Sequence, residues 1–253
     1  MQESYDIFEG MTSISAVIKS ISNCSGNRFI IKVLYDRNRA ESKSRELRFL
    51  SHSANTLGFT LEAVDPAEID NLTSGTTHGG IVAICSKREF PELNVNFLTN
   101  RRFIVLLEGV EDPYNFGYSV RSLYAAGVDG IVLPQRNWLE LSGTVARSSA
   151  GTTELIDLAI SDPLEAVKLF KDNGFEIICA GIRDSVSLYE HSFEKPTLLV
   201  IGGEKRGISR KILDLADVNV RIEYGRDFMG SLPSASAISV MAFEIAHKKG
   251  IIS

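Results

Sequence analysis

The second half of the chain alternates short apolar runs with amphipathic segments. The runs Ile104 to Leu107 and Leu198 to Ile201 are continuous, which is typical of parallel strands covered on both faces. The pattern predicts strands at Phe103 to Leu107, Gly130 to Leu133, Phe175 to Ala180, Leu198 to Ile201 and Asn219 to Ile222. It predicts helices at Gly117 to Ala126, Pro163 to Asn173, Ile208 to Ala216 and Ser234 to Lys249. This alternation indicates an α/β fold with a parallel sheet.

The first part of the chain has a less regular pattern and reads as a small mixed α/β domain. We predict helices near Ile14 to Ile21 and at Ser42 to Leu57, a helical turn at Asp65-Pro66, and strands at Phe29 to Leu34, Thr60 to Val64 and Gly80 to Cys85. The stretch Phe90 to Arg102 shows no periodicity and reads as a linker. We therefore expect two domains, residues 1–97 and 98–253.

Composition narrows the class of protein. With 253 residues, 44% hydrophobic and 23% charged, the chain has ordinary globular values and a length that suits two modest domains. No apolar run approaches the roughly 20 residues of a membrane helix, and Glu3, Asp6 and Glu9 occupy the start, where a signal peptide would be basic. We expect a cytoplasmic protein.

The cysteines and histidines give no sign of a metal or disulfide site. Cys24, Cys85 and Cys179 are far apart and form no CxxC pair, so we expect buried reduced thiols. The histidines are His52, His78, His191 and His247, which are too scattered for a metal cluster. We expect no metal.

Charge is uneven along the chain. The net charge of −5 argues against a protein that coats nucleic acid non-specifically. Within Arg28 to Arg48, however, seven basic and three acidic residues give +4. The candidate RNA contacts in this basic run are Arg37, Arg39, Lys43 and Arg45. A solvated helix face is the alternative explanation of this run.

Ligands of parallel sheets bind beyond the carboxyl ends of the strands, and segments of interest follow three of the predicted strands. Glu108 to Gly117 contains Asn115 and leads into a helix that carries Arg121. Gly202 to Gly207 opens a helix but is neither a Walker A loop nor GxGxxG. Ser231 to Ala237 contains Pro233 and small residues. Taken singly, the first segment is best explained as a capped turn with a surface arginine, the second gives poor support for a bound phosphate, and the third can be a helix start alone.

Together, in this order, the segments resemble the motifs of the SpoU or TrmH family of RNA ribose 2′-O-methyltransferases, in the SPOUT class. Asn115-x-Gly117 with Arg121 is similar to the first motif, Gly202-x-Glu204-x-x-Gly207 to the second, and Ile222 with Ser231-Leu232 to the third. The resemblance covers Phe103 to Gly250 and extends more loosely to the first part, which resembles an L30e-type RNA substrate-binding domain.

The resemblance implies a C-terminal trefoil knot, a homodimer, and S-adenosylmethionine as the methyl donor for ribosomal or transfer RNA. It points to donor-binding residues Ala180, Gly181, Gly202, Ile222 and Leu232. The candidate catalytic residues are Asn115, Arg121, Glu204 and Ser231. Because a guanidinium has a pKa above about 12, we expect Arg121 to clamp phosphate or ribose rather than to accept a proton.

The third motif departs from the family's usual pattern in two places, at Pro233 and at Glu223-Tyr224, where Pro-Met commonly follows the isoleucine. The family usually has Asn where this chain has Pro233, which offers neither a side-chain amide nor an N–H. Two readings follow: either a neighbour such as Ser234 substitutes in an active enzyme, or the chain is a non-catalytic RNA-binding member. The missing GxGxxG and Walker motifs disfavour a nucleotide-dependent Rossmann enzyme.

Overall fold

The computed structural model describes residues 5–23, 26–73, 78–135, 142–181, 183–203 and 206–253. The chain divides into two compact units. Unit 1 holds residues 1–89 together with 140–155, and unit 2 holds residues 90–139 and 156–253. The segment 140–155 therefore packs with unit 1, although it lies within the stretch of sequence that builds unit 2.

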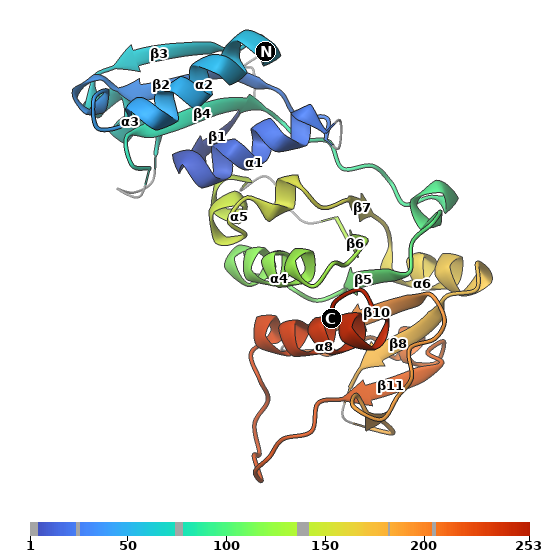
Figure 1. Cartoon of the computed structure of the whole chain (residues 1–253). Helices are drawn as coiled ribbons and strands as arrows, with labels where there is room; N and C mark the ends of the chain where they lie inside the picture. Colours follow the sequence, from blue (N-terminus) through green and yellow to red (C-terminus); the bar gives the residue numbers. More distant parts are fainter. Residues whose placement is uncertain (1–4, 24–25, 74–77, 136–141, 182, 204–205) are drawn as a thin grey trace. The chain divides into compact units, whose positions relative to one another are not determined.

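Unit 1 contains a mixed four-stranded sheet in the order β1-β4-β2-β3 (Figure 1). Its strands are β1 (Tyr5–Glu9), β2 (Ile30–Asp36), β3 (Thr60–Val64) and β4 (Ile81–Ser86). Strand β4 is antiparallel to β1 and β2, and β3 runs parallel to β2. The helices are α1 (Gly10–Ser22), α2 (Ser44–Leu57), α3 (Pro66–Leu72) and α5 (Ser142–Ser148), with 3₁₀ turns η1 (Arg37–Arg39) and η4 (Thr152–Glu154). The sequence pattern missed β1 and α5.

The core of unit 1 joins the sheet to α1, α2 and α5. Phe8 of β1, Val33 of β2 and Leu50 of α2 are fully buried in one cluster, to which α5 contributes Ala146. Helix α2 ends at Gly58, whose φ of +80° is the left-handed conformation that glycine adopts without strain. The predicted boundaries of α2 and β3 agree with the structure within two residues.

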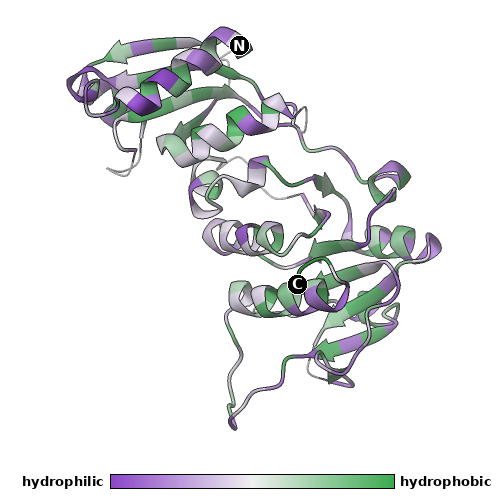
Figure 2. Ribbon diagram, viewed as in Figure 1, coloured by the Kyte–Doolittle hydropathy of each residue, from purple (hydrophilic) through white to green (hydrophobic). Residues whose placement is uncertain are grey.

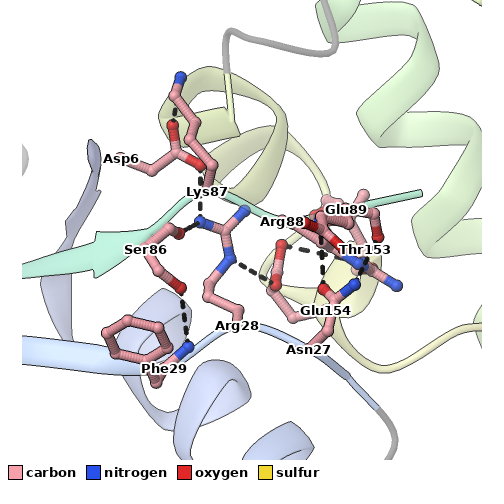
Figure 3. A network of polar contacts seen from close by, with 11 residues as sticks. Asp6, Asn27, Arg28, Phe29, Ser86, Lys87, Arg88, Glu89, Thr153 and Glu154 are labelled. Atoms are coloured by element: carbon pink, nitrogen blue, oxygen red, sulfur yellow. Dashed lines mark hydrogen bonds and ion pairs between the residues drawn. The ribbon is translucent and has the colours of Figure 1, made fainter. Parts of the chain in front are cut away.

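A buried ion-pair network fastens η4 to the rest of unit 1 (Figure 3). Arg28 is 5% exposed and pairs with Asp6 at 2.6 Å and with Glu154 at 3.1 Å. Its guanidinium also donates to the carbonyl of Ser86, and Lys87 pairs with Asp6 at 2.8 Å. Burial acts to lower the pKa of Arg28, but Glu154 and Asp6 outweigh it, so the pKa lies above its ordinary value. Arg28 is thus part of the interior of unit 1 and does not belong to an exposed basic face.

Unit 2 contains a seven-stranded sheet in the order β7-β6-β5-β10-β8-β11-β9. The strands are β5 (Phe103–Leu107), β6 (Gly130–Leu133), β7 (Leu158–Ile160), β8 (Glu176–Ala180), β9 (Val186–Ser187), β10 (Thr197–Ile201) and β11 (Val218–Arg221). Every pairing in this sheet is parallel, which confirms the predicted α/β architecture. The helices are α4 (Pro113–Ala125), α6 (Pro163–Asp172), α7 (Arg210–Leu213) and α8 (Ser234–Lys248), with the 3₁₀ turn η2 (Val95–Leu98) in the predicted linker.

The central strands of unit 2 are apolar throughout, and Figure 2 shows them as largely hydrophobic ribbon. All five residues of β5 and all five of β10 are buried, as continuous runs in a doubly covered sheet should be. Helix α4 begins at Pro113, earlier than predicted, because Asp112 caps it by accepting the N–H of Asn115 at 2.8 Å. Helix α7 is shorter than the predicted Ile208 to Ala216.

The end of α8 is fastened to the loop between β9 and β10. Lys249 is 6% exposed and donates to the carbonyls of Phe193 at 3.0 Å and Lys195 at 2.5 Å. Lys248 donates to three further carbonyls of the same loop. Burial, aided by the nearby charge of Arg102, lowers the pKa of Lys249 to about 8. Lys248 and Lys249 therefore hold this loop in place at the end of α8.

Candidate functional site

A cavity of about 600 Å³ opens at the carboxyl ends of β8, β10 and β11. Because these strands are parallel, the segments that follow them meet at one edge of the sheet. The residues predicted to bind a donor all lie on the wall of this cavity: Ala180, Gly181, Gly202, Ile222 and Leu232. Ser231, a candidate catalytic residue, lies on the same wall.

Glycines allow the loops around this cavity to approach one another. A Cβ on Gly202 would clash with the backbone of Gly207, and one on Gly109 would clash with the backbone of Gly203. Gly203 and Gly207 also exchange backbone hydrogen bonds of 3.3 and 2.9 Å, which closes the loop after β10 on itself. The glycine spacing noted in the sequence thus serves close backbone contact. Glu204, a candidate catalytic residue in this loop, lies outside the described residues.

The loop between β11 and α8 forms an aromatic part of the cavity wall. Tyr224, Phe228 and Met229 line it, and the rings of Tyr224 and Phe228 meet edge to face with centroids 5.7 Å apart. The Tyr224 hydroxyl accepts the backbone N–H of Leu232 at 3.3 Å. Sequence reasoning noted Tyr224 only as a departure from a motif, since nothing in the pattern shows that two residues eight positions apart meet across a loop.

A second cavity, of about 630 Å³, adjoins the first and shares Gly203, Gly207 and Ser234 with it. Its wall includes Asn115, as well as Glu108, which accepts the N–H of Ser209 at 3.2 Å. Its other charged lining residues are Glu111, Asp112 and Arg206. The two cavities therefore differ in character: four charged residues line this one, whereas apolar and aromatic residues predominate in the first, beside Arg221.

The structure does not place Arg121 on the wall of either cavity. It lies on α4, six residues after Asn115, and its side chain is exposed. The role of Arg121 at the edge of the strands stays a prediction.

The candidate RNA contacts lie on η1 and around the start of α2. Arg37 pairs with Asp65 at 3.5 Å, Arg39 with Asp36 at 3.2 Å, and Lys43 with Glu46 at 3.1 Å. The side chains of Arg37 and Arg39 remain more than half exposed, and Arg45 is exposed. These acidic partners reduce the local positive charge, but the Arg37–Asp65 pair is exposed on both sides, and such pairs are weak.

The described residues give no sign of metal or thiol chemistry. Among them, no group of three or more His, Cys, Asp or Glu is arranged to hold a metal ion. Cys85 and Cys179 are buried, and burial raises the pKa of each thiol to about 12, which makes them unreactive. Cys24 lies outside the described residues. No helix in the described ranges is both long and apolar enough to span a membrane.

Comparison with known proteins gives matches to two family models. Residues 102–243 match the model of the SpoU rRNA Methylase family, and residues 7–91 match that of the RNA 2′-O ribose methyltransferase substrate-binding domain. A Staphylococcus saprophyticus protein assigned to the TrmH family of tRNA/rRNA methyltransferases is 28% identical over 217 residues, covering 83% of this chain and 86% of its own.

Solved structures share the fold at lower identity. An AdoMet-bound rRNA methyltransferase from Sinorhizobium meliloti aligns with a TM-score of 0.78 at 21% identity, over 99% of this chain and 89% of its own. The SpoU methyltransferase AviRb from Streptomyces viridochromogenes, in complex with AdoMet, gives a TM-score of 0.76 at 22% identity, over 97% of this chain and 91% of its own.

Proposed function

Because the chain belongs to the SpoU rRNA methylase family, we propose that it transfers a methyl group from S-adenosylmethionine to a ribose 2′-hydroxyl of ribosomal or transfer RNA. The substrate-binding model matched by residues 7–91 supports RNA as the acceptor. The observation that carries the proposal is that the two cavities share Gly203, Gly207 and Ser234. Reactants held in adjoining cavities are already oriented for transfer, which removes much of the entropic barrier.

The apolar cavity fits the donor. Its volume of about 600 Å³ lies in the range of small-molecule sites, and it combines exposed backbone groups with aliphatic side chains. Gly202 leaves no room for a Cβ because the backbone of Gly207 packs against it, so the loop after β10 closes tightly at this wall. Ala180, Gly181, Gly202, Ile222 and Leu232 would hold the donor. When bound, S-adenosylmethionine supplies a methyl group that is activated by its sulfonium.

The protein's own part in the reaction is to position the acceptor. Asn115, at the edge of the charged cavity, presents an amide that can hold the ribose, and Ser231 lies on the neighbouring donor wall. We assign Arg121 the role of a clamp on the RNA, since its exposed guanidinium can bind a phosphate through two parallel hydrogen bonds. Glu204 is proposed to hold the loop after β10.

RNA contacts and assembly complete the proposal. Arg37, Arg39, Lys43 and Arg45 are proposed to contact RNA phosphates in unit 1. Helices α4 and α8 pack against each other and carry exposed aromatic side chains, namely Tyr114, Tyr118 and Phe243. These exposed side chains support a homodimer. A second copy would cover them. A cytoplasmic location follows from the proposed substrates. The trefoil knot and the L30e likeness stay predictions of the sequence resemblance.

The test combines donor binding with methyl transfer by the full chain. Calorimetry should show one S-adenosylhomocysteine site per chain, and unmodified ribosomal or transfer RNA should acquire radiolabelled methyl groups that nuclease digestion maps to ribose. Leu232→Asp should abolish donor binding, because it places an unpaired charge in an apolar wall. Val95→Asp, which puts the same charge on an exposed residue away from the cavities, is the control.

Arg121→Ala separates positioning from donor binding. We expect it to leave donor affinity unchanged and to lower the methylation rate by about 100-fold, the scale of a misplaced reactant. Arg121→Lys should restore little, since an ammonium lacks the planar fork. A wild-type chain that binds donor but methylates neither RNA would instead favour the non-catalytic reading suggested by Pro233.

A further inference from the structure

The loop between β11 and α8 encloses one side of the donor cavity with few attachments of its own. Within the described part of the chain, no backbone–backbone hydrogen bond ties residues 223–232 to other segments. The loop ends at Pro233, which has no N–H to donate. A loop of this kind must be ordered by side chains if it is to present a fixed wall to a ligand.

Tyr224 supplies such an attachment. Its hydroxyl accepts the N–H of Leu232 at 3.3 Å, so one hydrogen bond joins the two ends of the loop. Its ring meets Phe228 in the middle of the loop, and Phe228 in turn packs over Gly230, where a Cβ would come 2.5 Å from the ring. Tyr224, Phe228 and Leu232 all line the donor cavity. One side chain therefore contacts both the middle and the far end of the wall.

We infer that Tyr224 is a positioning residue for the methyl donor: its hydroxyl holds the backbone of Leu232, and through it the loop, in the shape that binds S-adenosylmethionine. This inference rests on the proposed function. A loop that is ordered before binding loses less conformational freedom when the ligand arrives, so the hydroxyl contributes to donor affinity without touching the reacting atoms. It acts on the donor side only, because Tyr224 does not line the charged cavity.

The test is Tyr224→Phe in the full chain, which removes the hydroxyl and keeps the ring. The loss of one hydrogen bond should weaken S-adenosylhomocysteine binding about fivefold and raise the KM for S-adenosylmethionine by a similar factor. The kcat, the KM for RNA and the Tm should stay at the wild-type values. The control is Tyr189→Phe, an equally conservative change at an exposed tyrosine of the same unit outside the donor cavity.

The outcomes separate this inference from the proposed function. If the wild-type chain binds donor and both Tyr224→Phe and Tyr189→Phe bind it with the same affinity, the positioning role is overturned. The methyltransferase proposal then still stands. A fall in kcat and Tm together, with donor KM unchanged, would also overturn it, because the hydroxyl would then be serving stability alone. Failure of the wild-type chain to bind donor would overturn both.

Discussion

Unit 1 buries the cation of Arg28 and unit 2 buries that of Lys249, and the two are stabilised by different partners. Arg28 is paired with the carboxylates of Asp6 and Glu154, while Lys249 donates to the carbonyls of Phe193 and Lys195. The exposed fractions are nearly equal, at 5% and 6%. Yet the pKa of Arg28 is raised, whereas burial lowers the pKa of Lys249 to about 8.

The difference teaches that burial and partner type must be considered together. A carboxylate carries a full opposite charge and can offset the loss of hydration, whereas a carbonyl carries only a partial charge. Arg28 is thereby fixed in its charged form, and removing it would take the shortest ion pair from each of two buried carboxylates. Lys249, with a pKa of about 8, loses its proton at a pH only slightly above neutral. The two sites should therefore differ in the size of their response to substitution, and only Lys249 should add a pH dependence near pH 8.

The largest effect is expected from Arg28→Met. It would leave Asp6 and Glu154 buried without their main partner, and breaking a buried pair in this way costs about 3–5 kcal/mol. Because Lys87 still pairs with Asp6 and Arg88 stays 3.9 Å from Glu154, we expect the lower end, about 3 kcal/mol. Hydrogen exchange of β1 and β4 amides reports the free energy of opening unit 1 directly.

The control for Arg28→Met is Arg37→Met, the same substitution in the same unit at an exposed pair. It should change the opening free energy by no more than about 0.5 kcal/mol. If the two variants behaved alike, the buried network would contribute no more than a surface ion pair, and its contrast with Lys249 would disappear.

The same contrast explains which parts of the fold could be predicted from the sequence. Apolar runs such as Phe103–Leu107 were predicted to the residue, because burial on both faces leaves a local signal. Strand β1 was missed because its inward residues include Asp6, a buried carboxylate in place of an apolar side chain. Its partner Arg28 was read as part of an exposed basic run. Glu154 lies 126 residues from Arg28, and no local pattern links them.

The candidate site likewise has a part that the sequence predicted and a part that it did not. The sheet architecture predicts that segments after parallel strands converge, and Gly181, Gly202 and Ile222 do meet around one cavity. The roles proposed for them came from the motif resemblance. The contact of Tyr224 with Leu232 could not be predicted, because it depends on how a loop without periodicity folds back. The local sequence therefore located the candidate site at the edge of the sheet. The shape of the cavity wall depends on tertiary contacts, which the local sequence does not reveal.

The next effect, of at most the same size, is expected from raising the pH. The pKa of Lys249 is about 8 in the folded chain, against about 10.4 for an ordinary lysine. Between these values the unfolded chain binds a proton that the folded chain has released, so the free energy of unfolding should rise with pH, by up to about 3 kcal/mol in total. Below pH 8 and above about pH 10.4, Lys249 contributes no slope.

The free energy of unfolding is measured against pH for the wild type and for Lys249→Met, and the difference isolates this contribution. Other lysines and tyrosines titrate equally in both proteins and therefore cancel. Exchange of β5 and β10 amides in unit 2, corrected for the intrinsic rate at each pH, gives the measurement. Parallel profiles for the two proteins would contradict the assignment of a lowered pKa to Lys249.

The smallest effect is expected from Lys249→Met at pH 7. The substitution removes two hydrogen bonds from a charged donor, each worth about 1.5–3 kcal/mol, but it also removes the cost of holding an ammonium group out of water. Phe193 and Lys249 both line a cavity of about 450 Å³, which water can enter. These terms nearly cancel, so we expect the opening free energy of unit 2 to change by no more than about 1 kcal/mol. A loss of about 3 kcal/mol, as large as that of Arg28→Met, would mean that backbone carbonyls stabilise a buried cation as well as carboxylates do.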